Sequence, residues 1–225
     1  MSIQLTRLLQ LASPTLPVGA YAYSQGLEWA VESAVIKDEA SALAWIGVLL
    51  QWNIGRYEAP LLVQMLRACN AHDEAHLAQL NARFLASRES AELRAETVQM
   101  GYSLTRLLGE LGAEGLPALE LARELATPSY PAVWACTSAS WQVEEEAALT
   151  AYLWSWIENQ TMAALKAVPL GQASGQRMML ALGARIAPIV GRAQQMAETE
   201  YSNLAPGFAI ACSQHETQYS RLFRS

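Results

Sequence analysis

Helical periodicity runs through almost the entire sequence of 225 residues, and this feature restricts the possible folds more than any other. No stretch alternates between apolar and polar residues over the length that a β-strand needs. Residues 38–52 are apolar on nearly every side, as expected of a helix in the middle of a bundle. Residues 144–168 have one apolar face, formed by Leu149, Tyr152, Leu153, Trp156 and Ile157 at helical spacing. The pattern predicts an all-α fold, with one domain over residues 1–225 built as a bundle of roughly ten helices.

Proline and glycine residues mark the expected helix boundaries. Pro14, Pro17 and Gly19 separate the first two helices, and Asp38 is placed to cap the next one by accepting a backbone N–H. Pro188 lies within a longer helical stretch, which we expect it to kink. The predicted helices cover residues 2–12, 25–35, 38–52, 56–69, 73–87, 90–111, 117–126, 131–142, 144–168, 174–198 and 207–219.

The composition is rich in apolar residues and poor in charge. Hydrophobic residues make up 52% of the chain and charged residues 16%, against roughly 45–50% and about 25% in a typical soluble protein. The apolar excess fits either a large helical core or a surface that faces a partner, and the composition leaves both open. The net charge is −6 and the pI is about 5.1, so nucleic acid is not an expected partner.

Cysteine usage and the absence of targeting segments favour a cytoplasmic location. Cys69, Cys136 and Cys212 are odd in number and far apart, which favours buried, reduced thiols over a disulfide framework. The apolar residues before the small-x-small triplet at 20–22 are too few and too interrupted for a signal peptide. No stretch approaches the roughly 20 uninterrupted apolar residues of a membrane span. We therefore expect a cytoplasmic protein that does not interact with a membrane.

Motifs for metal binding and catalysis are weak or absent. His72 and His76 have the i, i+4 spacing of a zinc protease helix, but Asp73 stands where those enzymes need Glu, and no third ligand follows nearby. We interpret this stretch as a polar helix start. Cys212 and His215 would share a helix face without a residue to orient them. Phosphate-binding loops and nucleophile elbows are missing, so we expect no enzymatic activity, no cofactor, and no catalytic or metal-binding residue.

Residues 159–197 form a cationic stretch in an otherwise acidic chain. The stretch contains Lys166, Arg177, Arg185 and Arg192 and no acidic residue, so it is suited to attract an acidic partner. Small residues at multiples of four positions let another helix approach closely, whether that helix belongs to the same chain or to another subunit. These small residues are Gly171, Gly175, Gly183, Ala187 and Gly191.

Three motifs together resemble the UreF family of urease accessory proteins. The first spans residues 8–28 and contains P-x-G at 17–19, an aromatic-rich stretch, and S-x-G-L-E at 24–28. The second is K-A-V-P-L-G-Q-A-S-G-Q-R at 166–177, and the third is the ending Y-S-R-L-F-R-S at 219–225. The three occur in the order typical of the family and spread over the chain, which makes the combination specific. Ala20 and the pair Ser13-Pro14 depart from the pattern of many members.

The resemblance implies an all-α protein that forms a homodimer and has no catalytic activity of its own. It implies a complex with UreD, called UreH in some organisms, and with the GTPase UreG. This complex acts on the apo-urease subunits so that a lysine is carbamylated and nickel is inserted. The protein would bridge UreD and UreG and regulate the GTPase, and the resemblance leaves open whether it activates or restrains it. A passage for nickel through the complex is also implied.

Carried over residue by residue, the resemblance assigns two sets of partner contacts. The C-terminal tail, residues 217–225, and the opening signature would contact UreD, while Lys166 and the residues after it would face UreG. The acid-free stretch around Lys166 would give the second surface a positive field. The UreD/UreH set is Tyr21, Tyr23, Glu28, Tyr219, Arg221, Phe223 and Arg224, and the UreG set is Lys166, Pro169, Leu170, Gly171, Gln172 and Arg177.

Two alternatives belong to other functional classes. One is a helical metal-binding protein or metalloenzyme that uses His72 and His76, which tight metal binding lost on His72→Ala would support. The other is a catalytic activator that supplies a cation from Arg177 or Arg192 to the transition state of a GTPase. Stimulated UreG turnover that an Arg→Ala change abolishes would support this second alternative.

Overall fold

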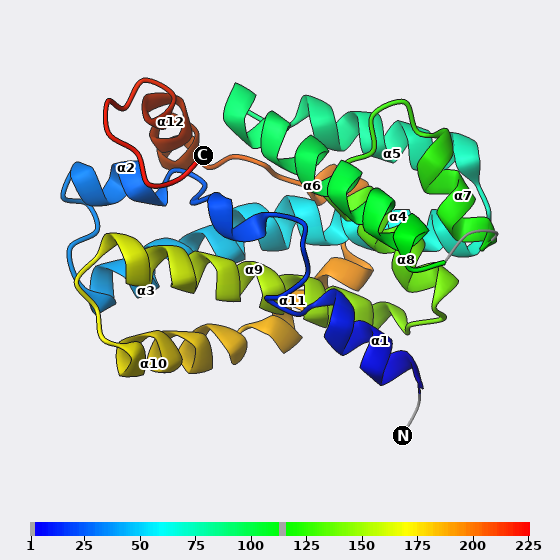
Figure 1. Cartoon of the computed structure of the whole chain (residues 1–225), viewed down its shortest axis with the longest axis horizontal. Helices are drawn as coiled ribbons and strands as arrows, with labels where there is room; N and C mark the ends of the chain where they lie inside the picture. The colour runs from blue at the N-terminus through cyan, green and yellow to red at the C-terminus, as the bar shows by residue number, and fades with distance from the viewer. Residues whose placement is uncertain (1–2, 113–115) are drawn as a thin grey trace.

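The computed structural model describes residues 3–112 and 116–225 and confirms the all-α prediction (Figure 1). Its described residues form helices and connecting segments without a strand. None of these helices is long and apolar enough to cross a membrane. The α-helices are α1 (Ile3–Leu11), α2 (Leu27–Glu32), α3 (Glu39–Leu49), α4 (Ala59–Asn70), α5 (Glu74–Ala86), α6 (Ala91–Glu110), α7 (Pro117–Glu124), α8 (Tyr130–Ser140), α9 (Glu145–Ala167), α10 (Gln172–Gly183), α11 (Ile186–Gln195) and α12 (Pro206–His215).

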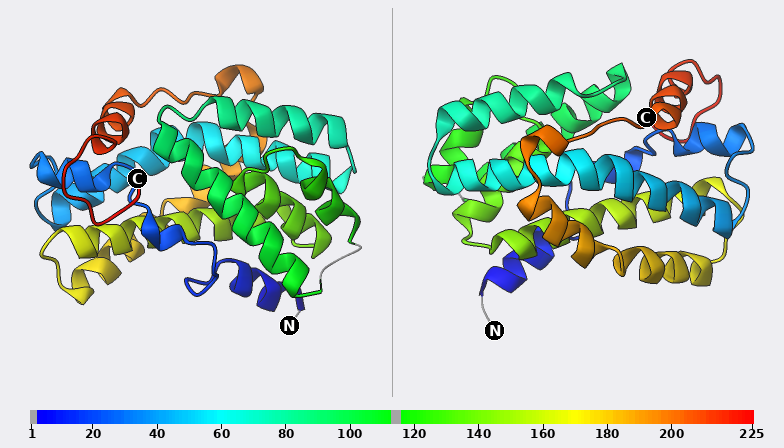
Figure 2. Two further views of the ribbon diagram at one scale, coloured as in Figure 1. Left: turned by 45° about the horizontal axis from the view of Figure 1, so that its top comes forward. Right: turned by 180° about the vertical axis from the view of Figure 1, so that it is seen from behind.

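Helix α4 lies at the centre of the bundle, and nine of its 12 residues are buried. It packs against α5, α8, α9 and α11, which together surround it. Helices α3, α9 and α10 run alongside one another in Figures 1 and 2, and α6 and α8 pack together toward the other end. The apolar side chains of these helices join into one continuous core cluster. This core also holds α2, α12 and the segment just before α2 together at one end of the bundle.

The predicted break between residues 52 and 56 is wrong, because a π-helical segment, Leu50–Glu58, joins α3 to α4 without interruption. Gly55 permits this wider helix, since a Cβ at that position would lie 2.8 Å from the carbonyl oxygen of Leu50. Asn53 faces the interior and donates a hydrogen bond from Nδ2 to Oδ1 of Asn203, at 2.9 Å. Segments of π-helix are rare and frequently mark functional sites.

The predicted helix 174–198 is also divided differently from the expectation. Pro188 does not kink a continuous helix. The chain instead ends α10 at Gly183 and begins α11 at Ile186. A proline excludes the carbonyl group four residues earlier, here that of Ala184, and it fits the first turn of a helix, where its missing N–H is not needed. The break therefore precedes Pro188 by one helical turn.

Two of the small residues in this region serve packing within the chain. A Cβ on Gly175 would lie 2.7 Å from the side chain of Leu165, and one on Gly183 would lie 3.3 Å from Trp154. In the part of the chain that the structure describes, no atom from outside the local backbone lies within 4 Å of the Cβ position of Gly171 or Gly191. The close helix approach predicted from the glycine spacing is thus an approach of α10 to α9.

The three cysteines are free and buried, as predicted. Cys69 of α4 and Cys136 of α8 face each other across the helix contact, with their Sγ atoms 3.2 Å apart. The hydrogen bond with the Cys69 thiol, followed by burial, raises the pKa of Cys136.

A matched pair of glycine substitutions tests this packing. A Cβ on Gly101 of α6 would lie 2.3 Å from the backbone oxygen of Pro128, so Gly101→Ala should lower the free energy of unfolding by about 1–3 kcal/mol. Gly191→Ala on the exposed side of α11 should raise it by up to about 1 kcal/mol, because alanine favours the helix and meets no neighbour. Urea denaturation measures both changes. Equal effects of the two substitutions would contradict the packing of α6 against the segment before α8.

Candidate partner-binding site

The opening signature folds into two tight turns that receive helix α12. Gly19 and Gly26 have φ angles of 84° and 72°, which lie in the left-handed region that favours glycine. A Cβ on Gly26 would also lie 3.0 Å from the backbone nitrogen of Cys212 in α12. Only glycine satisfies both conditions at this position. The S-x-G-L-E motif therefore brings α2 and α12 side by side, as Figure 1 shows.

The tail, residues 217–225, leaves α12 and returns across the signature (Figures 1 and 2). The Ser225 carbonyl oxygen accepts hydrogen bonds from the N–H and the hydroxyl of Ser24, each at 2.6 Å, and from the N–H of Gln25 at 3.1 Å. The N–H of Arg224 donates to the carbonyl oxygen of Ala22 at 2.7 Å. Main-chain bonds thus join the end of the described chain to its opening motif.

Glu28 of the signature holds the middle of the tail by its backbone. Its Oε1 accepts a hydrogen bond from the N–H of Leu222 at 2.7 Å, and its Oε2 accepts one from the N–H of Phe223 at 3.0 Å. The Glu28 side chain is buried beneath these two residues. Two consecutive amides bound to one carboxylate fix the direction of the chain at this point.

A second carboxylate and a histidine extend this contact. His215, the last residue of α12, is fully buried, with Nδ1 2.7 Å from Oε2 of Glu92 and Nε2 3.3 Å from Oε2 of Glu28. Arg221 of the tail pairs with the other oxygen of Glu92. Helices α2, α6 and α12 therefore all contribute polar groups to the surface on which the tail lies.

The tail separates its side chains into one buried group and several exposed ones. Phe223 is only 6% exposed and packs beneath Lys166 of α9, whose Nζ lies 5.5 Å from the centre of the ring. Tyr219 is fully exposed and Leu222 is 72% exposed. Arg224 is exposed as well. The fold thus brings Lys166, assigned to the UreG set, into contact with Phe223, assigned to the UreD set.

The members of the UreD set differ in accessibility. Tyr23 and Glu28 are buried with Phe223, whereas Tyr219, Arg221 and Arg224 are exposed. Tyr21 is half-buried, and burial, followed by the nearby Glu158 carboxylate, raises the pKa of its hydroxyl to about 12. The exposed members all belong to the tail, and the signature residues lie mainly beneath it.

The members of the UreG set lie on the connection between α9 and α10 and on α10 itself. Lys166, Pro169, Gly171 and Gln172 are exposed and Leu170 is half-buried. These residues adjoin the tail through the contact of Lys166 with Phe223.

Arg177 of the same set is engaged elsewhere. Its Nε lies 2.9 Å from Oε1 of Glu39 in α3, and this arginine and Ser174 lower the pKa of Glu39 to about 2. Arg185 packs its guanidinium against Gly47 of α3. Residues 159–197 contain no acidic residue, but the carboxylate of Glu39 lies beside them in the fold because α3 packs against α10.

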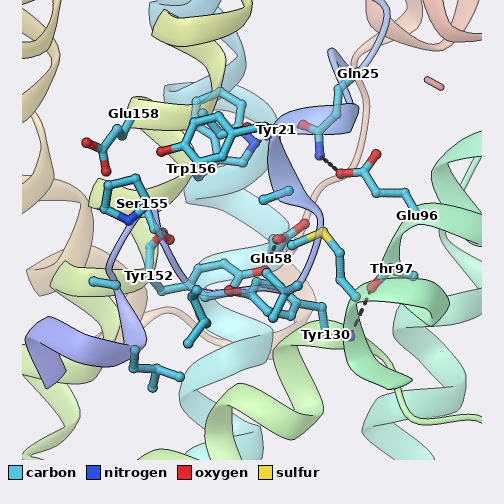
Figure 3. Close-up of a pocket in the computed structure, with 18 of the residues that line it drawn as sticks. Tyr21, Gln25, Glu58, Glu96, Thr97, Tyr130, Tyr152, Ser155, Trp156 and Glu158 are labelled. Carbon is cyan, nitrogen blue, oxygen red and sulfur yellow. Dashed lines mark hydrogen bonds between the residues drawn. The ribbon is translucent and has the colours of Figure 1, made fainter. Parts of the chain in front are cut away.

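A cavity of about 80 Å³ lies beneath the signature and is lined mainly by apolar side chains, and the buried polar groups that line it outside the signature were not expected from the sequence (Figure 3). Glu58 forms a buried ion pair with Arg88, at 3.3 Å, and accepts a hydrogen bond from the hydroxyl of Tyr152. Among the described residues, the Nε of Arg88 has no hydrogen-bond partner. Tyr130, whose pKa burial raises, also lines this space. These side chains are isolated polar positions in apolar helices, so no sequence motif marks them.

Glu96 of α6 connects the cavity to the tail. Its oxygens accept hydrogen bonds from Nε2 of Gln25 at 2.7 Å and from Oγ of Ser225 at 2.9 Å. Gln25 in turn accepts a hydrogen bond from the indole of Trp156, at 2.9 Å. Burial raises the pKa of Glu96 to about 7, and the hydrogen bonds from Gln25 and Ser225 oppose that shift.

The two histidines of the metal-binding alternative do not share a helix face. Helix α5 begins only at Glu74, and His72 has a φ of 54°, outside the helix. Asp73 caps the helix by accepting the N–H of His76 at 3.0 Å, which confirms the interpretation as a polar helix start. Among residues 3–112 and 116–225, no group of three or more His, Cys, Asp or Glu side chains is arranged to hold a metal ion.

The pairing of Cys212 with His215 does not form a nucleophile. Both residues are buried on α12, and burial, reinforced by the nearby Glu96 and Glu89, raises the pKa of the Cys212 thiol. A nucleophilic cysteine needs a lowered pKa, and His215 is occupied by the carboxylates of Glu28 and Glu92.

Comparison with known proteins places these features in a family. A model of the UreF family matches residues 36–183. The chain is 61% identical to the urease accessory protein UreF of Dechloromonas aromatica (strain RCB), over 99% of this chain and 98% of that protein. It is 58% identical to the UreF of Azoarcus sp. (strain BH72), over 99% and 96%. It is also 47% identical to the bifunctional urease accessory protein UreEF of Bordetella bronchiseptica, over 99% of this chain and 52% of that protein.

The buried Glu96 predicts a pH-dependent stability. Because the pKa of Glu96 is raised from 4.5 to about 7 on folding, the folded chain holds this proton more tightly than the unfolded chain. The free energy of unfolding should therefore fall as the pH rises between these values, by about 3 kcal/mol at most. Glu96→Gln removes this loss, so the variant should gain stability over the wild type between pH 5 and pH 8. Urea denaturation across this range measures the difference, and Glu110→Gln, an exposed change on the same helix, serves as the control.

Proposed function

The chain belongs to the UreF family, and we propose that it acts in urease maturation as a non-catalytic scaffold that bridges UreD, or UreH, and the GTPase UreG. In this proposal the chain is a single-domain cytoplasmic protein that works as a homodimer. It brings its partners to apo-urease while nickel is inserted, and it regulates the turnover of UreG. The observation that carries the proposal is the tail, which is held in place by the signature while it exposes Tyr219 and Leu222.

The tail is suited to bind UreD because hydrogen bonds to the signature hold it while its side chains face outward. Tyrosine and arginine residues dominate binding hot spots, and Tyr219, Arg221 and Arg224 are exposed on this segment. A segment already fixed by hydrogen bonds loses less conformational freedom on binding than a mobile one. Phe223 supports this surface from below, because it is buried under Lys166.

The connection from Lys166 to Gln172 is suited to bind UreG. Lys166 presents an exposed ammonium group, and the residues that follow it on the way into α10 carry no acidic side chain. Charge of this kind steers an acidic partner and selects its orientation. Arg177 contributes less to this surface, because its guanidinium is paired with Glu39. The same pairing disfavours Arg177 as a cation supplied to the GTPase.

Tyr219→Ala tests the UreD surface. Since the side chain is fully exposed, the substitution should leave the melting temperature unchanged, but it should weaken the affinity for UreD about tenfold or more, as expected of a hot-spot tyrosine. Isothermal titration calorimetry with purified UreD measures the affinity. Tyr102→Ala, which removes another exposed tyrosine on α6, is the matched control and should bind like the wild type. Equal affinity of both variants would exclude Tyr219 from the interface.

Lys166→Ala tests the UreG surface. The substitution should reduce co-purification of UreG and leave helicity and the mass of the dimer unchanged, and Lys166→Arg should retain most of the binding. Lys37→Ala removes the only other lysine, which is also exposed, and should have no effect. Unchanged recruitment of UreG by Lys166→Ala would remove Lys166 from the proposed contact.

A further inference from the structure

We infer that Glu28 is a positioning residue, which holds the tail in the conformation that its partner recognises and does not touch the partner itself. This inference deepens the proposed function and rests on it, because it takes the tail as the binding surface for UreD. It differs from the direct contact that the family resemblance implies for Glu28.

Both oxygens of Glu28 are already occupied within the chain. Oε1 accepts the N–H of Leu222, while Oε2 accepts the N–H of Phe223 and faces Nε2 of His215 at 3.3 Å. The residue is buried under the tail and beside α12. A partner would have to displace the tail before it reached this carboxylate. Glu28 can therefore influence binding only through the residues that it holds.

The contacts of Glu28 determine which side chains of the tail face outward. They involve backbone N–H groups, so they fix the path of the chain and not the chemistry of its side chains. With both amides turned toward the carboxylate, Leu222 points to solvent and Phe223 enters the core under Lys166. A shift of one residue along the tail would bury Leu222 and expose Phe223. Glu28 thus fixes the register of the tail at Leu222 and Phe223, beside the main-chain bonds that hold Arg224 and Ser225.

The neighbouring carboxylates do not duplicate this role. Glu92 binds the tail through the side chain of Arg221, and Glu96 binds it through the hydroxyl of Ser225. Either contact can follow a sliding backbone, because both involve rotatable side chains. Among the described residues, Glu28 is the side chain that accepts hydrogen bonds from consecutive amides of the tail.

Hydrogen exchange of the full-length chain without partners tests the hold of Glu28 on the tail. In Glu28→Gln, one of the two acceptor oxygens becomes an amide nitrogen, so the amides of Leu222 and Phe223 should exchange about tenfold faster or more. Glu32→Gln on the same helix is exposed and should leave the exchange unchanged. Glu28→Asp, which keeps the charge beside His215 but withdraws the carboxylate from the tail, should act like Glu28→Gln. Unaltered exchange at both amides in both Glu28 variants would overturn the inference.

A double-mutant cycle with Tyr219→Ala separates positioning from direct contact. If Glu28 acts through the tail, Glu28→Gln should weaken UreD binding about tenfold in the wild-type background and much less in the Tyr219→Ala background. Additive losses would show that Glu28 contacts UreD itself and would overturn the inference. Should the wild-type chain not bind UreD at all, the proposed function would fail, while the exchange experiment would still decide whether Glu28 holds the tail.

Discussion

Helix α4 buries nine of its 12 residues, and this constraint determines how the other helices are arranged. Only a narrow strip with Arg67 and Asn70 reaches the surface, so α5, α8, α9 and α11 have to cover the rest of the helix. Of these covering helices, α8 and α9 are buried over more than half of their residues. Polar side chains on them and on the adjoining π-helical segment, such as Tyr152 and Glu58, are then enclosed and have to pair with one another. The buried polar groups around the cavity are therefore a product of the same arrangement that makes the core.

At the end of the bundle formed by α2 and α12, the tail binds to the signature of the same chain. The signature supplies glycines where backbones approach closely, and it supplies Ser24 and Glu28 where the tail needs hydrogen-bond partners. These residues stabilise a surface without being part of it. Such a division of labour suits a scaffold, because the exposed side chains of the tail can be presented rigidly by a buried frame.

Local patterns predicted the helices well, because each apolar face repeats at helical spacing within one segment. The π-helical joint could not be predicted from the sequence, because Gly55 and Asn53 resemble a break when the packing of Ile189 and Asn203 around them is unknown. The motif of the tail was recognised in the sequence, but the residues that bind the tail were not. Glu28, Glu92 and Ser225 are separated by long stretches of sequence, and only the fold brings them together. The pairing of Arg177 with Glu39 could not be predicted for the same reason.

The contact between Ser24 and Ser225 joins residues 201 positions apart, which has a consequence for the order of folding. Contacts between distant residues form late, because closing a long loop costs entropy that local helices do not lose. During synthesis, the signature emerges first and has to wait for residue 225 before its hydrogen bonds can be completed. The carboxylate of Glu28 likewise stays hydrated until Leu222 and Phe223 have been synthesised. Closure of this junction therefore follows the synthesis of nearly all of the residues described.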